Sequence, residues 1–212
     1  ENTTASVTLC LSNNTPKTPH AGGFNNLVVF IRFSDDSEYT DLTTYFGDMY
    51  NSVLLNANSM INYYAEASYN QLMISTTFYP STTGTTVISY QDSHTRNYFL
   101  PYNETSNPNG YPDAEKWERE HTLIKAATVF ISSQVPAGLN IDADNDGKID
   151  GICFIIKGGT DNWGNILWPH VASTGEPFTY INGKQLYIYT IQLQTNLYTS
   201  GNGVLCHEMF HV

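Results

Sequence analysis

The sequence predicts a mixed α/β (α+β) domain, because strand and helix patterns alternate along its 212 residues. Residues 26–33 form an unbroken run of mainly β-branched and aromatic side chains, the pattern of a central strand buried on both faces. Residues 114–135 repeat apolar side chains at helical spacing, and Pro136 and Gly138 then end the helix. A chain of this length can bury one substantial core.

Shorter elements surround this framework. We expect helices at 42–55 and 59–69, strands at 72–79, 85–90 and 152–157, and loops at 91–113 and 196–202. The Asn182-Gly183 pair between 178–181 and 184–194 predicts a β-hairpin, because Asn-Gly supplies the positive φ angles of a tight turn.

Composition and charge limit the classes of partner. The net charge is −11, and nine Lys and Arg residues are too few to neutralise a row of nucleic-acid phosphates. The same balance suits cations and weakly favours basic peptides. No apolar run reaches the length of a transmembrane helix. The low charged fraction of 14% is typical of an extracellular protein, and we expect a secreted or cell-surface monomer.

The three cysteines do not form a disulfide framework. Cys153 lies in an apolar strand pattern and Cys206 in an apolar helix pattern, so both are expected to be buried thiols. Cys10 would be a metal ligand only in a latent precursor, and no motif around it supports that role.

The strongest chemical signal is His-Glu-x-x-His, at His207, Glu208 and His211. On a helix, positions i and i+4 share one face, so two imidazoles can bind one zinc ion. Glu208 can then act as general base toward a water activated by the metal. The spacers are apolar, which predicts a buried helix. The alternative is a core helix that carries two histidines by chance.

A catalytic zinc of this kind needs a third protein ligand. The motif supplies two ligands, His207 and His211, and only Val212 follows them in the given sequence. We therefore expect the chain to continue beyond Val212, so that the site of the given chain is incomplete. The other possibility is a third ligand upstream.

A second signal is an acidic loop with the spacing of an oxygen-ligand calcium site. The expected ligands are Asp142, Asp144, Asp146, the backbone carbonyl of Lys148, and Asp150. Cys153 stands where an EF-hand has a bidentate Glu, so the loop is not a true EF-hand. The alternative is a solvated acidic turn; a bound Ca²⁺ would be structural.

The remaining histidines are weaker candidates. His170 follows a Trp-Pro pair and is expected to be a structural histidine near the cleft rather than a metal ligand or transition-state stabiliser. His121 lies in the long helix, at its rim or in the core, and His20 and His94 lie in loops.

Five stretches carry a family resemblance, and they occur in the order LVVFIRFSD (27–35), YYAEASY (63–69), DADNDGKIDG (142–151), ILWPH (166–170) and GVLCHEMFH (203–211). Together they resemble the immune inhibitor A-type family of secreted bacterial zinc metallopeptidases. The resemblance implies a zincin-like catalytic domain with a mixed twisted sheet, a backing helix and an active-site helix. The matching stretches fall within 24–212, which would be the N-terminal part of the catalytic domain. Residues 1–23 are polar and end in a Pro/Gly stretch, so we expect a leader, a propeptide tail or a linker there.

The expected function is therefore zinc-dependent endopeptidase activity on proteins or peptides, with the 184–194 strand as one candidate for pairing with the substrate backbone. A non-catalytic extracellular binding domain on a degenerate zincin scaffold is the alternative. A zinc amidase acting on cell-wall peptides or modified proteins is a third possibility.

Overall fold

The computed structural model describes residues 18–159 and 166–212. Its centre is a mixed six-stranded sheet in the order β2-β1-β4-β8-β5, with β3 also paired to β1. The strands are β1 (Gly22–Arg32), β2 (Leu72–Tyr79), β3 (Tyr90–Gln91), β4 (Ile152–Ile156), β5 (His170–Ser173) and β8 (Ile188–Leu193). All pairings are parallel except that of β5 with β8.

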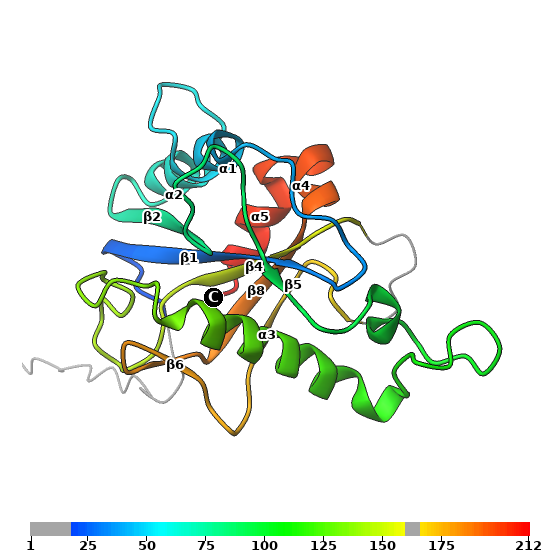
Figure 1. Ribbon diagram of the computed structural model, residues 1–212. Helices are drawn as coiled ribbons and strands as arrows, with labels where there is room; N and C mark the ends of the chain where they lie inside the picture. The colour runs from blue at the N-terminus through cyan, green and yellow to red at the C-terminus, as the bar shows by residue number, and fades with distance from the viewer. Residues whose placement is uncertain (1–17, 160–165) are drawn as a thin grey trace, which may run out of the picture.

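Five α-helices of the described residues cover the two faces of this sheet (Figure 1). One face carries α1 (Thr43–Asn51), α2 (Met60–Ala67), α4 (Gln194–Ser200) and α5 (Asn202–Met209). The other carries α3 (Lys116–Ser132) and the hairpin of β6 (Tyr180–Ile181) and β7 (Lys184–Gln185). Short 3-10 turns lie at Arg96–Phe99 and Asp113–Glu115.

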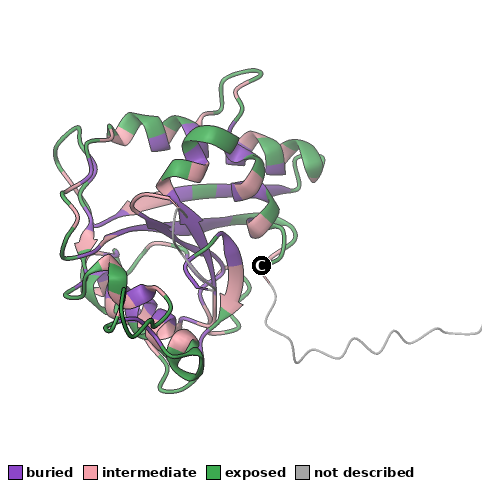
Figure 2. Ribbon diagram, turned by 90° about the vertical axis from the view of Figure 1, so that its right-hand side faces the viewer, coloured by how far each residue is buried: buried purple, intermediate pink, exposed green. Residues whose placement is uncertain are grey.

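Strand β1 shows why the sequence needs this layered arrangement. Leu27 and Val29 pack into the core beneath α3, whereas Val28 and Phe30 pack into the core beneath α1, α2 and α5. Alternate side chains of a strand point to opposite faces, so an uninterrupted apolar run requires cover on both sides. Figure 2 shows buried residues concentrated in the strands, with the outer sides of the helices exposed.

Several local predictions are confirmed. Strand β2 has the predicted bounds. Helix α2 begins where expected, because the Ser59 side chain accepts a hydrogen bond from the Asn62 amide at 3.3 Å. The hairpin turn has φ angles of 50° at Asn182 and 78° at Gly183, as its Asn-Gly sequence predicts.

The helix predicted at 42–55 is shorter than expected. It ends at Asn51, whose side-chain amide donates to the Thr76 carbonyl and whose side-chain carbonyl accepts from the Thr76 amide, both at 2.8 Å. This pair of bonds fastens the helix end to β2. Val53, Leu54 and Leu55 then lie in a loop and are 69%, 73% and 92% exposed.

Two other element predictions are wrong. The strand predicted at 85–90 is reduced to β3 and to an isolated bridge between Leu42 and Thr86. The loop predicted at 196–202 is mostly helix α4, because Leu197 is buried in the core and docks this otherwise polar segment.

The beginning of the chain meets the sheet earlier than expected. Strand β1 starts at Gly22, inside the segment 1–23 that we expected to be a leader or linker. Thr18 donates a 2.6 Å hydrogen bond to the Asp150 carbonyl. Cys10 lies outside the described residues. Among the helices of the described residues, none has the length and apolarity needed to cross a membrane.

The two described cysteines are buried free thiols, as predicted. Burial raises the pKa of Cys153 to about 11 and that of Cys206 to about 12, so neither is a thiolate near neutral pH.

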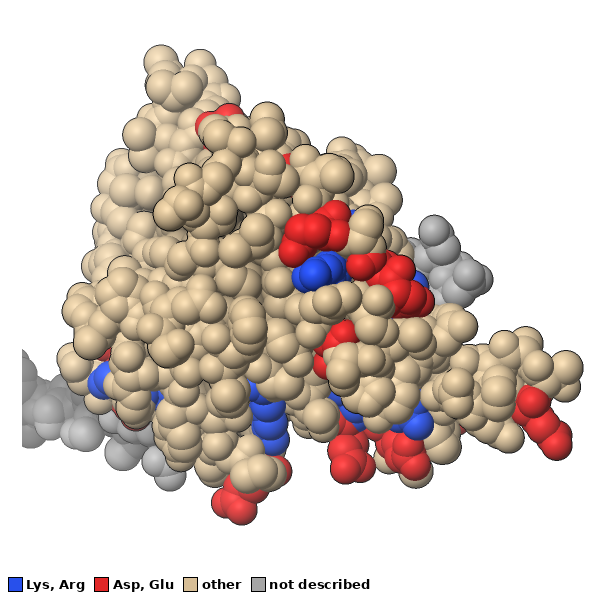
Figure 3. Space-filling model, in the orientation of Figure 1, with Lys and Arg blue, Asp and Glu red and all other residues tan. Residues whose placement is uncertain are grey.

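On the face of the molecule drawn in Figure 3, charged side chains are sparse, and lysine and arginine form only small groups.

Candidate functional site

Helix α5, which carries the His-Glu-x-x-His motif, is held to the sheet by one face. Leu205, Cys206 and Met209 are buried in the core. The start of the helix is fixed by Asn202, whose side chain donates to the carbonyls of Met49 at 3.2 Å and Asn58 at 2.5 Å.

The opposite face of α5 is more open than the sequence predicts. We expected a helix buried apart from its ligand positions, but Phe210 is 71% exposed and both motif histidines are exposed. A cavity of about 360 Å³ lies on this face, between Asn58, Tyr63, Phe210 and the two histidines. The motif is therefore accessible from outside.

His207 and His211 converge as predicted. Their Nε2 atoms lie 3.2 Å apart, and their ring centroids are 4.8 Å apart. Helix α5 ends at Met209, but the His211 amide donates to the Glu208 carbonyl at 3.1 Å and so keeps one further tight turn. Two nitrogens bound to one tetrahedral zinc at about 2.0–2.1 Å would lie about 3.3 Å apart. The two histidines therefore fit a shared zinc ion.

A third protein ligand is not assembled by the described residues. Within 18–159 and 166–212, no further His, Cys, Asp or Glu side chain joins His207 and His211 in a potential metal-binding group. An upstream third ligand is thus not found in this part of the chain. Without a metal, the same separation suits a hydrogen bond between one protonated ring nitrogen and the other's lone pair.

Glu208 lies about 100° further around the helix than His207, on the side toward β5. Its side chain is partly buried, and its carboxylate is close enough to His170 to help raise the pKa of that imidazole. Helix α5 and strand β5 are in contact. The motif thus offers two converging imidazoles and a carboxylate next to an edge strand of the sheet.

His170 belongs to a buried polar network and not to the histidine pair. Its Nε2 lies 3.1 Å from Oε1 of Glu120, which also accepts a 2.7 Å hydrogen bond from the Tyr189 hydroxyl. Its Nδ1 lies 2.6 Å from the Trp168 carbonyl. Both ring nitrogens face acceptors, so both carry a proton when Glu120 is ionised. The structural role expected for His170 agrees with these contacts.

The pKa directions follow from this network. Burial by itself raises the pKa of Glu120 and lowers that of His170. Their mutual hydrogen bond and attraction, with the Leu167 amide and Tyr189 hydroxyl on the carboxylate, outweigh burial. The pKa of Glu120 is therefore lowered and that of His170 is raised. Both shifts favour the ion pair of an imidazolium and a carboxylate.

Sequence reasoning missed Glu120 and Tyr189. The available signal was an acidic residue on the apolar face of 114–135, because Glu120 precedes Leu123 and Ile124 by one helical turn.

His121 and His94 do not belong to the network of Glu120, His170 and Tyr189. His121 is partly buried beside Tyr189, with a pKa lowered by burial, and His94 lies in a loop bonded to Asp92.

The acidic loop brings three of its predicted ligands together. Carboxylate oxygens of Asp142, Asp144 and Asp146 lie within 4.8 Å of one another. Calcium binds oxygens at about 2.3–2.6 Å, so such oxygens fit around one ion. Asp142 is 6% exposed, and its Oδ1 is buried with no hydrogen-bond partner. Its Oδ2 accepts from Lys184 Nζ at 2.5 Å and from the Gly147 amide at 3.2 Å.

Asp150 is placed differently. Asp150 is buried outside the group of three, and its Oδ2 accepts from the Ala143 amide at 2.6 Å. Burial, with the charges of the three other aspartates, raises its pKa to about 6. The Lys148 ammonium pairs with Asp146 at 3.0 Å, and the role of the Lys148 backbone carbonyl as a ligand stays a prediction. A metal ion can thus be held by three carboxylates of this loop, and the ion's identity is a separate question.

The strand expected to receive a substrate backbone is not available. Strand β8, within the predicted 184–194 segment, is hydrogen-bonded to β4 on one side and to β5 on the other. Among the described residues, β5 has a partner only on the β8 side, so its other side is an edge. The backbone of β5 can therefore pair with an added strand.

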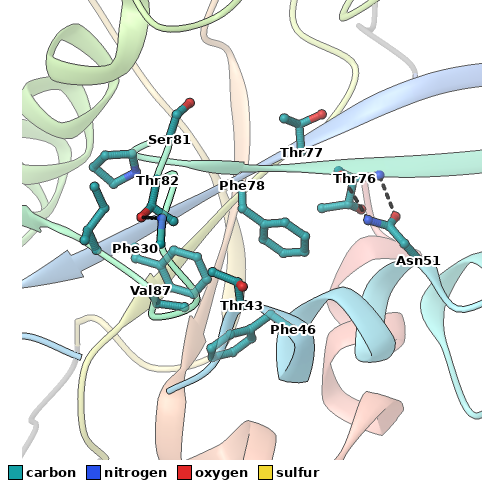
Figure 4. A pocket seen from close by; sticks show the side chains of 13 residues that line it. Phe30, Thr43, Phe46, Asn51, Thr76, Thr77, Phe78, Ser81, Thr82 and Val87 are labelled. Carbon is teal, nitrogen blue, oxygen red and sulfur yellow. Dashed lines mark hydrogen bonds between the residues drawn. The ribbon is translucent and has the colours of Figure 1, made fainter. Parts of the chain in front are cut away.

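A second cavity, of about 350 Å³, lies between α1 and β2 and shares no residue with the one beside the histidines. Figure 4 shows Phe46 and Phe78 projecting toward it and Asn51 bonded to Thr76 at its end. Its lining is apolar and hydroxylic, with no charged side chain.

Comparison of the chain with models of known protein families and with curated protein sequences gave no match.

Proposed function

We propose that this chain is part of a secreted zinc-dependent metalloendopeptidase with a zincin-like catalytic domain. The observation that carries the proposal is the 3.2 Å separation of the His207 and His211 Nε2 atoms at an open cavity. Two imidazole nitrogens this close can bind one cation, and the separation matches tetrahedral zinc. The mixed sheet, the α3 layer and the edge position of β5 support this class of fold.

The residues of the chain would divide the work as follows. His207 and His211, with a third ligand, would hold zinc, which supplies Lewis-acid activation of water and of the substrate carbonyl. Glu208 would accept the proton of the attacking water and pass it to the leaving amine. Its side chain is partly buried on the side of α5 toward β5, where it would face a peptide paired with that strand.

The substrate would bind as an added strand on β5. Because β5 is an edge strand in contact with α5, a peptide paired with it would pass next to Glu208. Such a site recognises backbone amides and carbonyls, which fits an endopeptidase better than an enzyme for small substrates.

Calcium in the acidic loop would have a structural role. The orphaned Oδ1 of Asp142 supports a cation, since a buried carboxylate oxygen without a partner is unfavourable. A divalent ion would also relieve the repulsion among Asp142, Asp144 and Asp146. The loop precedes β4 directly, so the ion would stabilise the central sheet.

The deciding experiment replaces Glu208 by Gln in the full-length protein. Hydrolysis of casein or of a quenched peptide should fall by about 10²–10⁴-fold or more, because a general base is lost. Zinc content, measured by mass spectrometry, should stay unchanged. Glu104→Gln, at an exposed loop position, is the matched control and should keep full activity.

Retained hydrolysis in the Glu208→Gln variant would end the proposal. An intact protein that binds zinc and peptides but cleaves none would instead support the binding-domain alternative. No feature of the described residues favours the amidase possibility over these two.

A further inference from the structure

Trp168 is an exposed aromatic side chain in a segment that is otherwise buried. The residue is 47% exposed, whereas the preceding residues Ile166 and Leu167 are fully buried. Leu167 has a φ of 59°, a left-handed conformation that a leucine rarely adopts. A strained backbone that turns a large apolar ring outward calls for a structural cause.

Glu120 supplies that cause from beneath. Its Oε2 accepts the Leu167 amide at 2.9 Å, and its Oε1 accepts from His170 at 3.1 Å. A single buried carboxylate therefore holds the loop on both sides of Trp168. Since the carboxylate is fully buried and also bonded to Tyr189, it has little freedom to move.

His170 fixes both the backbone and the ring of Trp168. Its Nδ1 donates to the Trp168 carbonyl at 2.6 Å, and the two rings are stacked with centroids 5.0 Å apart and planes 23° apart. One face of the indole is thus occupied by His170. An aromatic ring held in this way loses little conformational entropy when a ligand packs on its other surface.

The position of Trp168 relates it to the proposed reaction. His170 begins β5, and the carboxylate of Glu208 acts electrostatically on His170. Trp168 therefore lies just before the edge strand that contacts α5, the helix that carries Glu208. A peptide antiparallel to β5 places its C-terminal half beside the start of that strand.

We propose that Trp168 is a specificity-determining residue that contacts an apolar or aromatic side chain on the C-terminal side of the bond to be cleaved, and that Glu120 is its positioning residue. This inference rests on the proposed peptidase function. Apolar contact with a fixed indole favours such side chains over glycine or charged ones.

The competing role for Trp168 is to shield the Glu120–His170 pair from water. That role predicts losses that are the same for every substrate. A specificity role predicts losses that depend on the substrate side chain. The ratio of kcat/KM between two peptides separates the two roles, because a general loss of folded or active enzyme cancels in the ratio.

The experiment compares Trp168→Ala with Trp117→Ala in the full-length protein. Trp117 is similarly exposed and also lies near His170, with ring centroids 6.3 Å apart, but it belongs to α3. Paired peptides differ only in Phe or Gly directly after the cleaved bond. Trp168→Ala should lower the Phe/Gly ratio of kcat/KM by about tenfold or more. Trp117→Ala should leave the ratio unchanged.

The role of Glu120 is tested with the same ratio. Glu120→Gln should reduce it, because the amide cannot hold both Leu167 and His170 as the carboxylate does. Tyr189→Phe removes one bond to the same carboxylate but leaves the loop contacts, and it should keep the ratio near that of the wild type. An unchanged ratio in Glu120→Gln would remove Glu120 from the proposal.

A binding measurement separates this inference from the proposed function. In the Glu208→Gln background, the Phe peptide should bind at least tenfold more tightly than the Gly peptide, and Trp168→Ala should abolish that difference. Cleavage with an unchanged ratio in Trp168→Ala overturns the inference alone. Trp168-dependent binding without cleavage in the wild type overturns the peptidase and leaves Trp168 only as a contact for an apolar peptide side chain, and the absence of both binding and cleavage overturns both.

Discussion

The Tyr64 hydroxyl donates a 2.7 Å hydrogen bond to the carbonyl of Cys206, the residue immediately before His207. Tyr64 is buried on α2, so this bond links α2 to α5 at the candidate metal site. The same carbonyl accepts the Phe210 amide at 3.1 Å. The tyrosine thus fixes the turn that brings the two histidines together.

Replacing Tyr64 by Phe should loosen that turn. The loss of one buried hydrogen bond should cost about 1 kcal/mol of unfolding free energy. Zinc affinity should fall severalfold, as isothermal titration would show, because the spacing of His207 and His211 is less well fixed. Tyr69→Phe, at a position that is 86% exposed, should change neither quantity. Equal zinc affinity for wild type and Tyr64→Phe would contradict the link.

The zinc site makes a direct prediction for each histidine. Mutation of a residue that only supports a metal ligand lowers affinity by about 10–100-fold. His207→Ala and His211→Ala each remove a ligand, so each should lower zinc affinity by more than that. His94→Ala removes a histidine from a distant loop and should leave zinc binding intact. Metal analysis after dialysis against a defined zinc buffer provides the measurement. Wild-type zinc content in either motif variant would exclude a shared ion.

The acidic loop predicts calcium-dependent stability. At about 100 times its Kd, calcium should add about 2.7 kcal/mol. For a chain of this size the corresponding rise in Tm is about 5–10 °C. Asp144→Asn or Asp146→Asn should remove most of that rise in Tm, whereas Asp113→Asn, in an exposed turn, should leave it unchanged. A thermal scan with calcium and with chelator measures the effect; identical Tm values for the wild-type protein would refute the site.

The Glu120–His170 pair predicts how stability depends on pH. The folded pKa of His170 is raised above 6.5, so its contribution is complete below pH 6.5 and is lost as pH rises through the raised value. The folded pKa of Glu120 is lowered below 4.5, so its contribution is lost as pH falls through that lowered value. Asp150 has the opposite sign to Glu120. Its folded pKa is raised from 3.8 to about 6, so it lowers the stability of the fold as pH rises from 3.8 to 6.

The test of this pair is urea unfolding from pH 5.5 to 9. The wild type should lose stability above pH 6.5, and Glu120→Gln should be about 3–5 kcal/mol less stable near pH 6, with a flatter profile above it. An unchanged slope in the variant would show that another group titrates there. NMR of the His170 ring gives the pKa directly and should show a lower value in the variant.

Local signals explain which parts of the fold were predictable. The apolar run of β1, the Asn-Gly turn and the i, i+4 histidines each depend on neighbouring residues, and all three appear as predicted. Helix α4 was missed because its sequence is polar, and it is helical through the docking of Leu197. The shortened α1 ends because Asn51 bonds with a strand that lies 25 residues further along the chain.

The candidate site divides in the same way. The three motif residues were identified from their spacing, but the Glu120–His170–Tyr189 network joins side chains that are 50 and 69 residues apart from Glu120. No pattern within one segment can indicate such a partner. The edge position of β5 was equally hidden, because it depends on the insertion of β8 between β4 and β5.

The strand order has a consequence for biosynthesis. Strand β1 leaves the ribosome well before its partner β4, which begins only at Ile152, and before β8, the next strand beyond β4, which is complete only at Leu193. The apolar run of β1 can thus pair with β2 early, but it waits for its other neighbour until residues 152–156 have been made. Long-range parallel strand pairs form slowly, and until they form the exposed apolar segments can self-associate. Yield on expression should therefore depend more on chaperone capacity than on the stability of the finished domain.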